Sequence, residues 1–270
     1  MSRKIRYALI YLFLAIAAFI SVFPFYWMVV GSTNTSLDVN KGKLTFGNQF
    51  FVNIQNLITN FDLGRVFWNS IQISFFVVIL SVVASSMAGY GFEMYKSKGM
   101  KYIYGGTLLT LMVPFAALMV PVFRLMTYLN LIDSLWGVIL PMIPSVFLIF
   151  FFKQNFQTYP REIIMAARVD GASELRIFFS IVMPSMKATY AAAAIYSFLT
   201  SWNAYLQPLV IIQSQEKRTM ALFIANLASG YQPDFGLVMT AVVVATVPAL
   251  ILFFMLQRYF VQGVLGSVKQ

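Results

Sequence analysis

The acidic residues of this chain are the groups that proton transfer, ion binding or hydrolysis would need, and they avoid its apolar stretches. The nine of them are Asp38, Asp62, Glu93, Asp133, Glu162, Asp170, Glu174, Glu216 and Asp234. The chain contains no cysteine and no histidine, which excludes thiol chemistry and the commonest general base and metal ligand. Hydrolases that work inside a membrane use paired aspartates, metal-bound histidines or an activated serine. No such set can be assembled here, so we predict a protein that is not an enzyme and holds no metal.

Transport driven by ions and transport driven by ATP require different residues. Proton- or sodium-driven carriers often hold acidic or histidine side chains at membrane depth, and this chain lacks them. An ion-coupled secondary carrier stays an alternative, since the carbonyls of broken helices can hold sodium. The phosphate-binding pattern G-x-x-x-x-G-K-[ST] is also absent. If ATP drives transport, another polypeptide hydrolyses it, and this chain binds no cofactor itself.

A polar group of residues within a late apolar stretch could recognise a solute. The group comprises Ser197, Thr200, Ser201, Trp202, Asn203, Tyr205 and Gln207. Sugars are bound by aromatic faces stacked on C–H surfaces and by amide and hydroxyl groups on the ring hydroxyls. We therefore predict that four of them, Ser201, Trp202, Asn203 and Tyr205, line a substrate pathway. The alternatives are an aromatic belt with helix–helix hydrogen bonds, or a partner subunit that holds the solute while this chain only shapes the path.

Membrane helices must position these residues. The hydrophobic fraction is 60% and the charged fraction is 10%, against about 25% charged residues in soluble domains. Apolar stretches predict six spans, and the first is too long for the core of a cleavable signal peptide. The predicted spans are residues 7–30, 67–91, 102–123, 134–152, 189–212 and 235–256.

The distribution of Lys and Arg predicts the orientation. With six spans both termini lie on one side, and thirteen of the 19 basic residues fall on that side. The positive-inside rule therefore places both termini in the cytoplasm. The net charge of +10 follows from this distribution and does not indicate nucleic acid. We expect contact with lipid and none with nucleic acid.

The polar interval of residues 160–188, between the fourth and fifth spans, reads as ordered structure. Pro160 suits a first helical turn, and Asp170-Gly171 should end that helix because glycine accepts positive φ. Ser173 can cap a second, amphipathic helix, which Pro184 then interrupts. One interpretation is a helix resting on lipid headgroups.

The order of residues in this interval resembles the signature loop of permease subunits from bacterial ABC importers of the maltose type. The matching residues are Ala166, Ala167, Asp170, Gly171 and Ala172, followed by Phe179, Ile181 and Pro184. Stretches at 69–70, 88–90, 202–208 and 259–269 also look like family positions. The chain departs from the family at Met165, where Glu is usual, and at Ala188, where Pro is frequent.

The resemblance implies an all-α polytopic membrane protein with a cytoplasmic coupling helix between spans four and five. The implied coupling residues are Glu162, Met165, Ala166, Ala167, Asp170, Gly171 and Ala172. The implied partners are a second related permease, two ATPase subunits carrying ATP and Mg, and an extracytoplasmic binding protein. An outer loop at Gly230, Tyr231 and Gln232 would contact that binding protein.

The resemblance also implies domain bounds and a function. Residues 1–66 would form a first span and external loop, and residues 67–270 the permease domain. We expect an importer of sugars, with an oligosaccharide as the substrate, in a bacterial cytoplasmic membrane. The alternatives are an importer of glycerol phosphate or another polyol derivative, an ion-coupled carrier, and a non-transporting scaffold.

Two patterns leave their structural role open. Ser81, Ser85 and Gly89 recur every four residues, and such small residues allow close helix contact within the chain or with a partner. Proline occurs in five of the six predicted spans. It either kinks helices to open a cavity or is merely tolerated.

Overall fold

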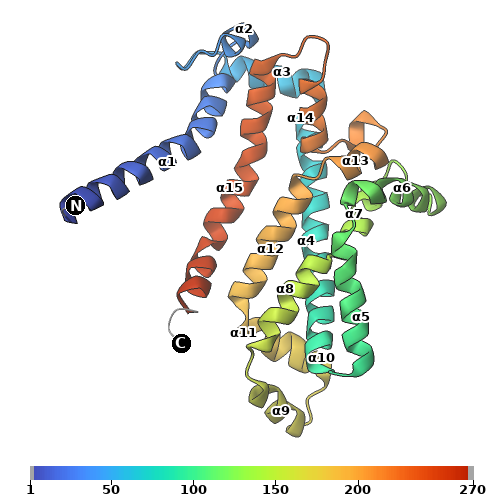
Figure 1. The fold of residues 1–270 in the computed structure, drawn as a ribbon. Helices are drawn as coiled ribbons and strands as arrows, with labels where there is room; N and C mark the ends of the chain where they lie inside the picture. The colour runs from blue at the N-terminus through green and yellow to red at the C-terminus, as the bar shows by residue number, and fades with distance from the viewer. Residues whose placement is uncertain (1–2, 267–270) are drawn as a thin grey trace. The chain divides into compact units, whose positions relative to one another are not determined.

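The computed structural model describes residues 3–266, and within them the chain is helical with no strand (Figure 1). Three helices are long and apolar enough to cross a membrane by themselves: α1 (Arg3–Ser32), α4 (Leu63–Met94) and α15 (Phe235–Gly266). The all-α prediction is therefore confirmed. Of the thirteen basic residues predicted on the cytoplasmic side, Lys269 lies outside the described residues.

Three further candidate spans are bent pairs of helices, so the described chain has up to six spans if each pair counts as one. The bends measure 99°, 40° and 87° in chain order. Pro114 and Pro144 lie at the first two bends, where the missing N–H and the ring of proline disfavour a continuous helix. The third bend follows Pro184 and falls at Met186. Of the two interpretations of the prolines, a bend in the helix therefore applies at Pro114 and Pro144.

The bent pairs are built from short elements. The first joins α5 (Lys98–Leu109) and η1 (Thr110–Met112) to η2 (Phe115–Leu118) and α6 (Met119–Tyr128). The second joins α7 (Leu135–Met142) to α8 (Val146–Gln157). The third joins α10 (Glu174–Ile177), a π-helical turn (Phe178–Val182) and α11 (Met183–Ser185) to α12 (Lys187–Trp202).

Two boundaries differ from those predicted. The fifth span does not continue to residue 212, because α12 ends at Trp202 and a separate helix, α13 (Leu206–Ile211), follows. Residues 31–65 form no plain loop, since they contain α2 (Ser36–Asn40) and α3 (Phe50–Phe61). The other elements are α9 (Arg161–Val169), η4 (Gln215–Lys217) and α14 (Met220–Ala228).

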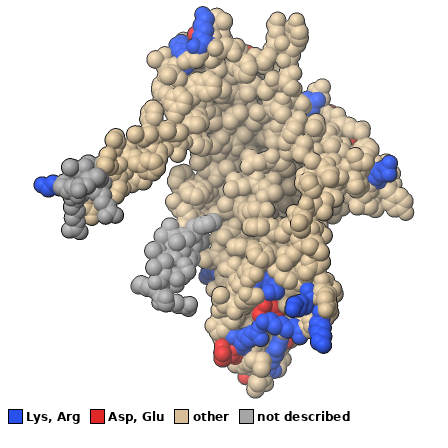
Figure 2. Space-filling model, viewed as in Figure 1, with Lys and Arg blue, Asp and Glu red and all other residues tan. Residues whose placement is uncertain are grey.

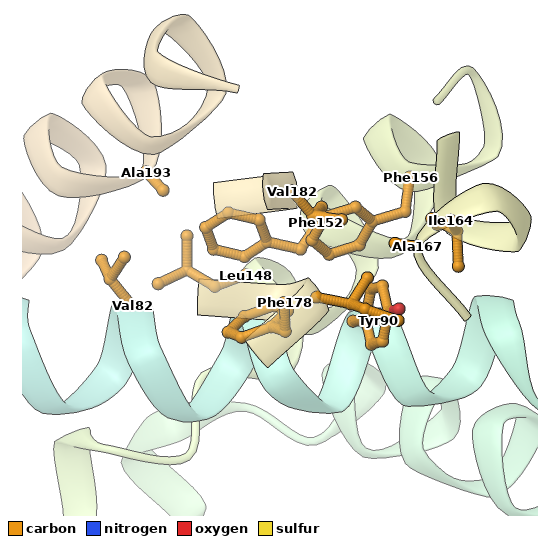
Figure 3. Close-up of a cluster of buried hydrophobic side chains, with 11 residues drawn as sticks. Val82, Tyr90, Leu148, Phe152, Phe156, Ile164, Ala167, Phe178, Val182 and Ala193 are labelled. Carbon is orange, nitrogen blue, oxygen red and sulfur yellow. The ribbon is translucent and has the colours of Figure 1, made fainter. Parts of the chain in front are cut away.

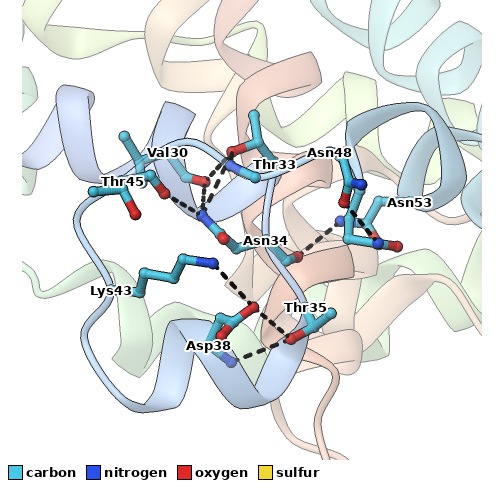
Figure 4. Close-up of polar contacts among 11 residues, drawn as sticks. Val30, Thr33, Asn34, Thr35, Asp38, Lys43, Thr45, Asn48 and Asn53 are labelled. Carbon is cyan, nitrogen blue, oxygen red and sulfur yellow. Dashed lines mark hydrogen bonds and ion pairs between the residues drawn. The ribbon is translucent and has the colours of Figure 1, made fainter.

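The chain forms two compact units, one of Met1–Gly64 with Phe223–Val247 and one of Arg65–Leu222 with Pro248–Gln270. In the first unit, buried asparagines satisfy the carbonyl groups at the end of α1 (Figure 4). Asn34 Nδ2 donates to the carbonyls of Val30 and Thr45, both at 2.9 Å. Asn53 Nδ2 donates to the carbonyl of Asn34 at 3.2 Å. These bonds order the connection between α1 and α3.

The second unit holds the core that positions the candidate site. Ser81, on α4, lies 2.7 Å from Ser197 Oγ on α12. A Cβ on Gly89 would stand 2.8 Å from the Cβ of Phe152, on α8. The small residues of α4 therefore allow close contact within the chain, which decides the question that their spacing left open.

Candidate coupling surface and transport pathway

Helix α9 is amphipathic, and its two faces have different environments. Its buried side chains are Ile164 and Ala167. The opposite face is exposed and largely apolar, with exposed fractions of 45% for Ile163, 58% for Met165 and 88% for Val169. An exposed apolar face held on an ordered helix is typical of a protein contact.

The turn after α9 forms as the sequence predicted. Asp170 ends the helix and Gly171 adopts a φ of +79°, the left-handed region that glycine tolerates best. The amide of Ala172 donates to the carbonyl of Ala167 at 3.0 Å, which closes the helix end as in a Schellman motif. Ser173 Oγ then accepts from the amide of Arg176 and caps α10.

An ion pair spans this turn. Arg168 Nε lies 2.6 Å from Glu174 Oε1, and Arg168 Nη2 lies 3.2 Å from Glu174 Oε2. Arg168 donates both of these hydrogen bonds to the Glu174 carboxylate, which raises the pKa of Arg168 above its ordinary value. Because both partners are partly exposed, the pair contributes more to fixing the angle between α9 and α10 than to stability.

On the buried side of α9, a cluster of aromatic and aliphatic side chains ties the turn to α4 and α8 (Figure 3). Ile164 and Ala167 point into a set that includes Tyr90, Phe156 and Phe178. The ring centroids of Tyr90 and Phe178 are 5.3 Å apart, and those of Tyr90 and Phe156 are 5.6 Å apart. A displacement of α9 would therefore be transmitted to α4 and α8 through packed side chains.

A buried carboxylate reinforces this attachment. Glu93, in the last turn of α4, is 1% exposed. Its Oε1 lies 2.7 Å from both Lys96 Nζ and Arg161 Nη2, and its Oε2 lies 3.5 Å from Lys153 Nζ. These cations come from the loop after α4, from α9 and from α8. Glu93 lies one residue from the end of the candidate span Leu63–Met94, whereas the predicted span ended at residue 91, and basic residues from three segments neutralise its charge.

The structure separates the predicted coupling residues into two groups. Glu162, Met165, Ala166, Asp170 and Gly171 are exposed around α9 and its turn. Ala167 is buried and Ala172 is partly buried against the cluster of Figure 3. The side chains of the first group are open to solvent, whereas those of the second hold the loop to its own chain.

The predicted pathway residues also separate. Trp202 is 4% exposed and lies between Phe67 and Phe198, with ring centroids 5.7 Å and 5.4 Å away. Ser201 is buried and its hydroxyl donates to the carbonyl of Ser197, so both residues support α12. Asn203 and Tyr205 instead line a cavity of about 500 Å³ beside the broken helices α7 and α8.

Gln207 is a further polar residue of this cavity. It is 2% exposed, and its Nε2 donates to the carbonyl of Val138 at 2.8 Å. Its Oε1 is buried and has no hydrogen-bond partner in the described part of the chain. An orphaned buried acceptor is uncommon and fits a ligand hydroxyl or a bound water. Its position in the polar run with Asn203 and Tyr205 is the sequence signal that could have identified it.

The predicted outer contact lies in the first unit. Gly230, Tyr231 and Gln232 are exposed in the segment after α14, and Tyr231 is 100% exposed. Within residues 3–266, no group of three or more carboxylate, histidine or cysteine side chains could hold a metal ion.

Residues 81–266 match the model of a family described as the binding-protein-dependent transport system inner membrane component. The chain belongs to this family. Its members are non-catalytic permease subunits, so the chain is a multi-pass membrane permease subunit.

The relatives extend the match beyond the family model. The lactose transport system permease protein of Rhizobium radiobacter is 49% identical over 96% of this chain and 95% of its own length. An arabinooligosaccharide transport system permease protein of Halalkalibacterium halodurans is 37% identical over 94% of each chain. A glycerol-3-phosphate transport system permease protein of Yersinia pestis is 28% identical over 96% of each.

A solved structure has the same fold. It belongs to a bacterial ABC transporter involved in the import of the acidic polysaccharide alginate. The TM-score is 0.84 at 20% identity, over 96% of this permease and 99% of that chain. The match therefore covers nearly the whole fold, including the bent helices.

Proposed function

We propose that this permease is one of two related membrane subunits of an ATP-driven, binding-protein-dependent importer of neutral sugars, with an oligosaccharide as the substrate. The relatives named for lactose and arabinooligosaccharides, at 49% and 37% identity, support this substrate class. The relative named for glycerol 3-phosphate, at 28% identity, makes a polyol phosphate the second candidate.

The lining of the 500 Å³ cavity is the observation that favours a neutral sugar. Its polar side chains are hydroxyl and amide groups, and its aromatic residues are Phe115 and Tyr205. Among the described residues that line it, none is charged. A phosphate ester would be recognised best by Arg, Lys or a helix N-terminus. Hydroxyls of a sugar can bond to Asn203 and to the orphaned Oε1 of Gln207, while an aromatic face covers C–H groups.

The proposed cycle assigns one task to each end of the permease. The exposed face of α9 docks on one of two ATPase subunits, which carry ATP and Mg. An extracytoplasmic binding protein delivers the sugar and contacts the segment of Gly230, Tyr231 and Gln232. Both termini then lie in the cytoplasm of a bacterium, as the distribution of basic residues predicts.

The test is uptake by vesicles that contain the permease, its partner permease, both ATPase subunits and the binding protein. We expect uptake of lactose or an arabinooligosaccharide to require internal ATP and to survive collapse of the proton and sodium gradients. Uptake that follows an ion gradient without ATP would identify an ion-coupled carrier. Preferential uptake of glycerol 3-phosphate would assign the polyol phosphate instead.

Substitutions in the cavity test the pathway separately. Asn203→Ala should lower uptake roughly fivefold, which corresponds to the loss of one hydrogen bond. Ser201→Ala is the matched control, because Ser201 bonds only within its own helix in the described structure. Equal effects of the two variants, at equal amounts of assembled complex, would assign Asn203 to packing.

A further inference from the structure

A second cavity, of about 390 Å³, lies where α4 ends and α5 begins. Four lysines line it: Lys96, Lys98, Lys101 and Lys153. They come from the loop after α4, from α5 and from α8. Figure 2 shows Lys and Arg side chains gathered at the end of this unit that bears α9 and α10. No carboxylate is among the described residues that line the cavity.

The nearest acidic group does not balance this charge. Glu93 already interacts with Lys96, Lys153 and Arg161. Lys98 and Lys101 are exposed and form no ion pair within the described part of the chain. Four ammonium groups around one cavity repel one another unless an anion lies between them. The cavity therefore has the charge of an anion site.

Tyr104 gives the cavity a second feature that points to a ligand. Its ring lies 4.9 Å from Lys153 Nζ, and Lys153 is held beside it. The hydroxyl of Tyr104 is buried without a hydrogen-bond partner in the described residues. Buried hydroxyl groups are normally hydrogen-bonded, so this donor lacks an acceptor. Phosphate oxygens would accept both from it and from the lysines.

The position of the cavity identifies the source of that phosphate. Because the candidate span of α4 ends at Met94, two residues before Lys96, we expect the cavity at the level where hydrocarbon meets the headgroup layer. Tyr102 is 79% exposed, as expected for an aromatic residue at this interface. Farther along α5, Ile103 and Leu109 are 59% and 66% exposed and offer an apolar surface to acyl chains.

We propose that this cavity binds the phosphate headgroup of an anionic phospholipid, with the acyl chains along α5. Basic pockets between membrane helices at the cytoplasmic surface are suited to such headgroups. The inference does not depend on the transported substrate or on coupling to an ATPase.

Native mass spectrometry of the full chain in a nonionic detergent tests the proposal. The chain is titrated with phosphatidylglycerol and with phosphatidylcholine of the same acyl chains, and phosphatidylglycerol should bind preferentially. The double variant Lys98→Gln/Lys101→Gln should weaken phosphatidylglycerol binding roughly 30-fold. Arg176→Gln/Lys187→Gln is the matched control, because it removes the same charge at exposed residues that do not line the cavity. Tyr104→Phe should weaken binding severalfold with little effect on phosphatidylcholine.

Three results would overturn the proposal. The first is equal binding of the two lipids by the unsubstituted chain. The second is equal loss of phosphatidylglycerol in the two double variants, which would indicate a general effect of charge. The third is displacement of phosphatidylglycerol by an equal concentration of inorganic phosphate, which would identify a site for free anions.

Discussion

Gly171 is the residue at which the turn after α9 can be tested with least disturbance elsewhere. Its φ is +79°, and a Cβ added there would meet nothing within 4 Å in the chain itself. A β-branched residue there would therefore strain the backbone by on the order of 1–2 kcal/mol without a clash inside the chain. Its side chain would also add bulk on the side where a partner would dock. Gly171→Val should abolish uptake and detach or uncouple the ATPase, measured as co-purification and sugar-stimulated hydrolysis.

Gly171→Asn is the matched control, since asparagine adopts positive φ more readily than valine. We expect it to retain more of the ATPase than the valine variant. Full stimulation of hydrolysis with Gly171→Val would mean that the loop is only a connector.

Met165→Glu should be tolerated, because Met165 is 58% exposed and contacts Arg168 only at 3.9 Å.

Glu93 provides a second prediction at this scale. Glu93→Gln leaves Lys96, Arg161 and Lys153 without their shared carboxylate. Lys96 and Arg161 are more than half exposed, so water screens part of the loss, and we expect a cost of about 1–3 kcal/mol. Thermal unfolding of the purified permease in detergent measures it. Glu162→Gln, at an exposed position of α9, should leave the melting temperature unchanged; a similar drop in both variants would contradict the assigned role.

Asp133 predicts a dependence on pH. Its carboxylate accepts from the amides of Ser214 and Gln213 and from Lys217, and these bonds hold its pKa well below the ordinary value of 3.8. The folded pKa lies below the unfolded one, so the stabilisation is fully present above about pH 5 and is lost as the pH falls below 3.8.

Asp133→Asn should therefore lower the melting temperature at pH 7 and have a smaller effect near pH 3. Ser214→Ala removes one donor and should give a smaller loss at pH 7. A difference between Asp133→Asn and the unsubstituted chain that stays constant from pH 7 to pH 3 would contradict the proposed hydrogen bonds.

The structural role of a residue could be predicted from the sequence where that role depends on its neighbours in the chain. Gly171 and Ser173 have the turn and cap roles predicted for them, and Pro160, predicted in the first helical turn, lies one residue before it, at the N-cap of α9. Such roles depend on near neighbours in the sequence. Trp202 and Glu93 could not be placed. Whether a tryptophan faces a cavity or Phe67, and whether a carboxylate finds three cations, depends on segments far apart in the chain.

At the scale of elements, the apolar stretches predict where helices lie but not where they break. Pro114 and Pro144 coincide with bends of 99° and 40°, whereas Pro24 and Pro248 lie inside continuous helices. The sequence around each proline is similarly apolar. Tertiary packing therefore decides which proline bends its helix, and local sequence does not contain that information.

The segment between α13 and α15 is the element to test on the outer side. It contains a short 3₁₀ turn, α14 and the fully exposed Tyr231, so it is more than a plain connector. Deleting residues 230–232 should lower the ATPase activity that the binding protein stimulates and leave the basal rate intact. A deletion of residues 41 and 42, which are exposed in the loop after α2, is the control. Equal loss of basal and stimulated activity would argue against a contact with the binding protein.

At the scale of the whole molecule, the orientation in the membrane is open to direct measurement. The chain has no cysteine, so single cysteines can be introduced without background labelling. Cysteines at the exposed positions Ser97 and Ser173 should react only from the cytoplasm, and those at Asn40 and Gln215 only from outside. External labelling at Ser173 would invert the orientation and remove α9 from the reach of an ATPase.

The unbroken length of α4 has a mechanical consequence. Tyr90 and Glu93 attach its one end to the segments around α9, while Asn69 and Ser70 bond to the backbone of residues 216–220 near its other end. Its 32 residues make a rod of about 48 Å. A tilt of about 10° around one end of such a lever sweeps the other through roughly 8 Å. A small rotation applied at α9 is thus delivered, enlarged, to the loop on the far side.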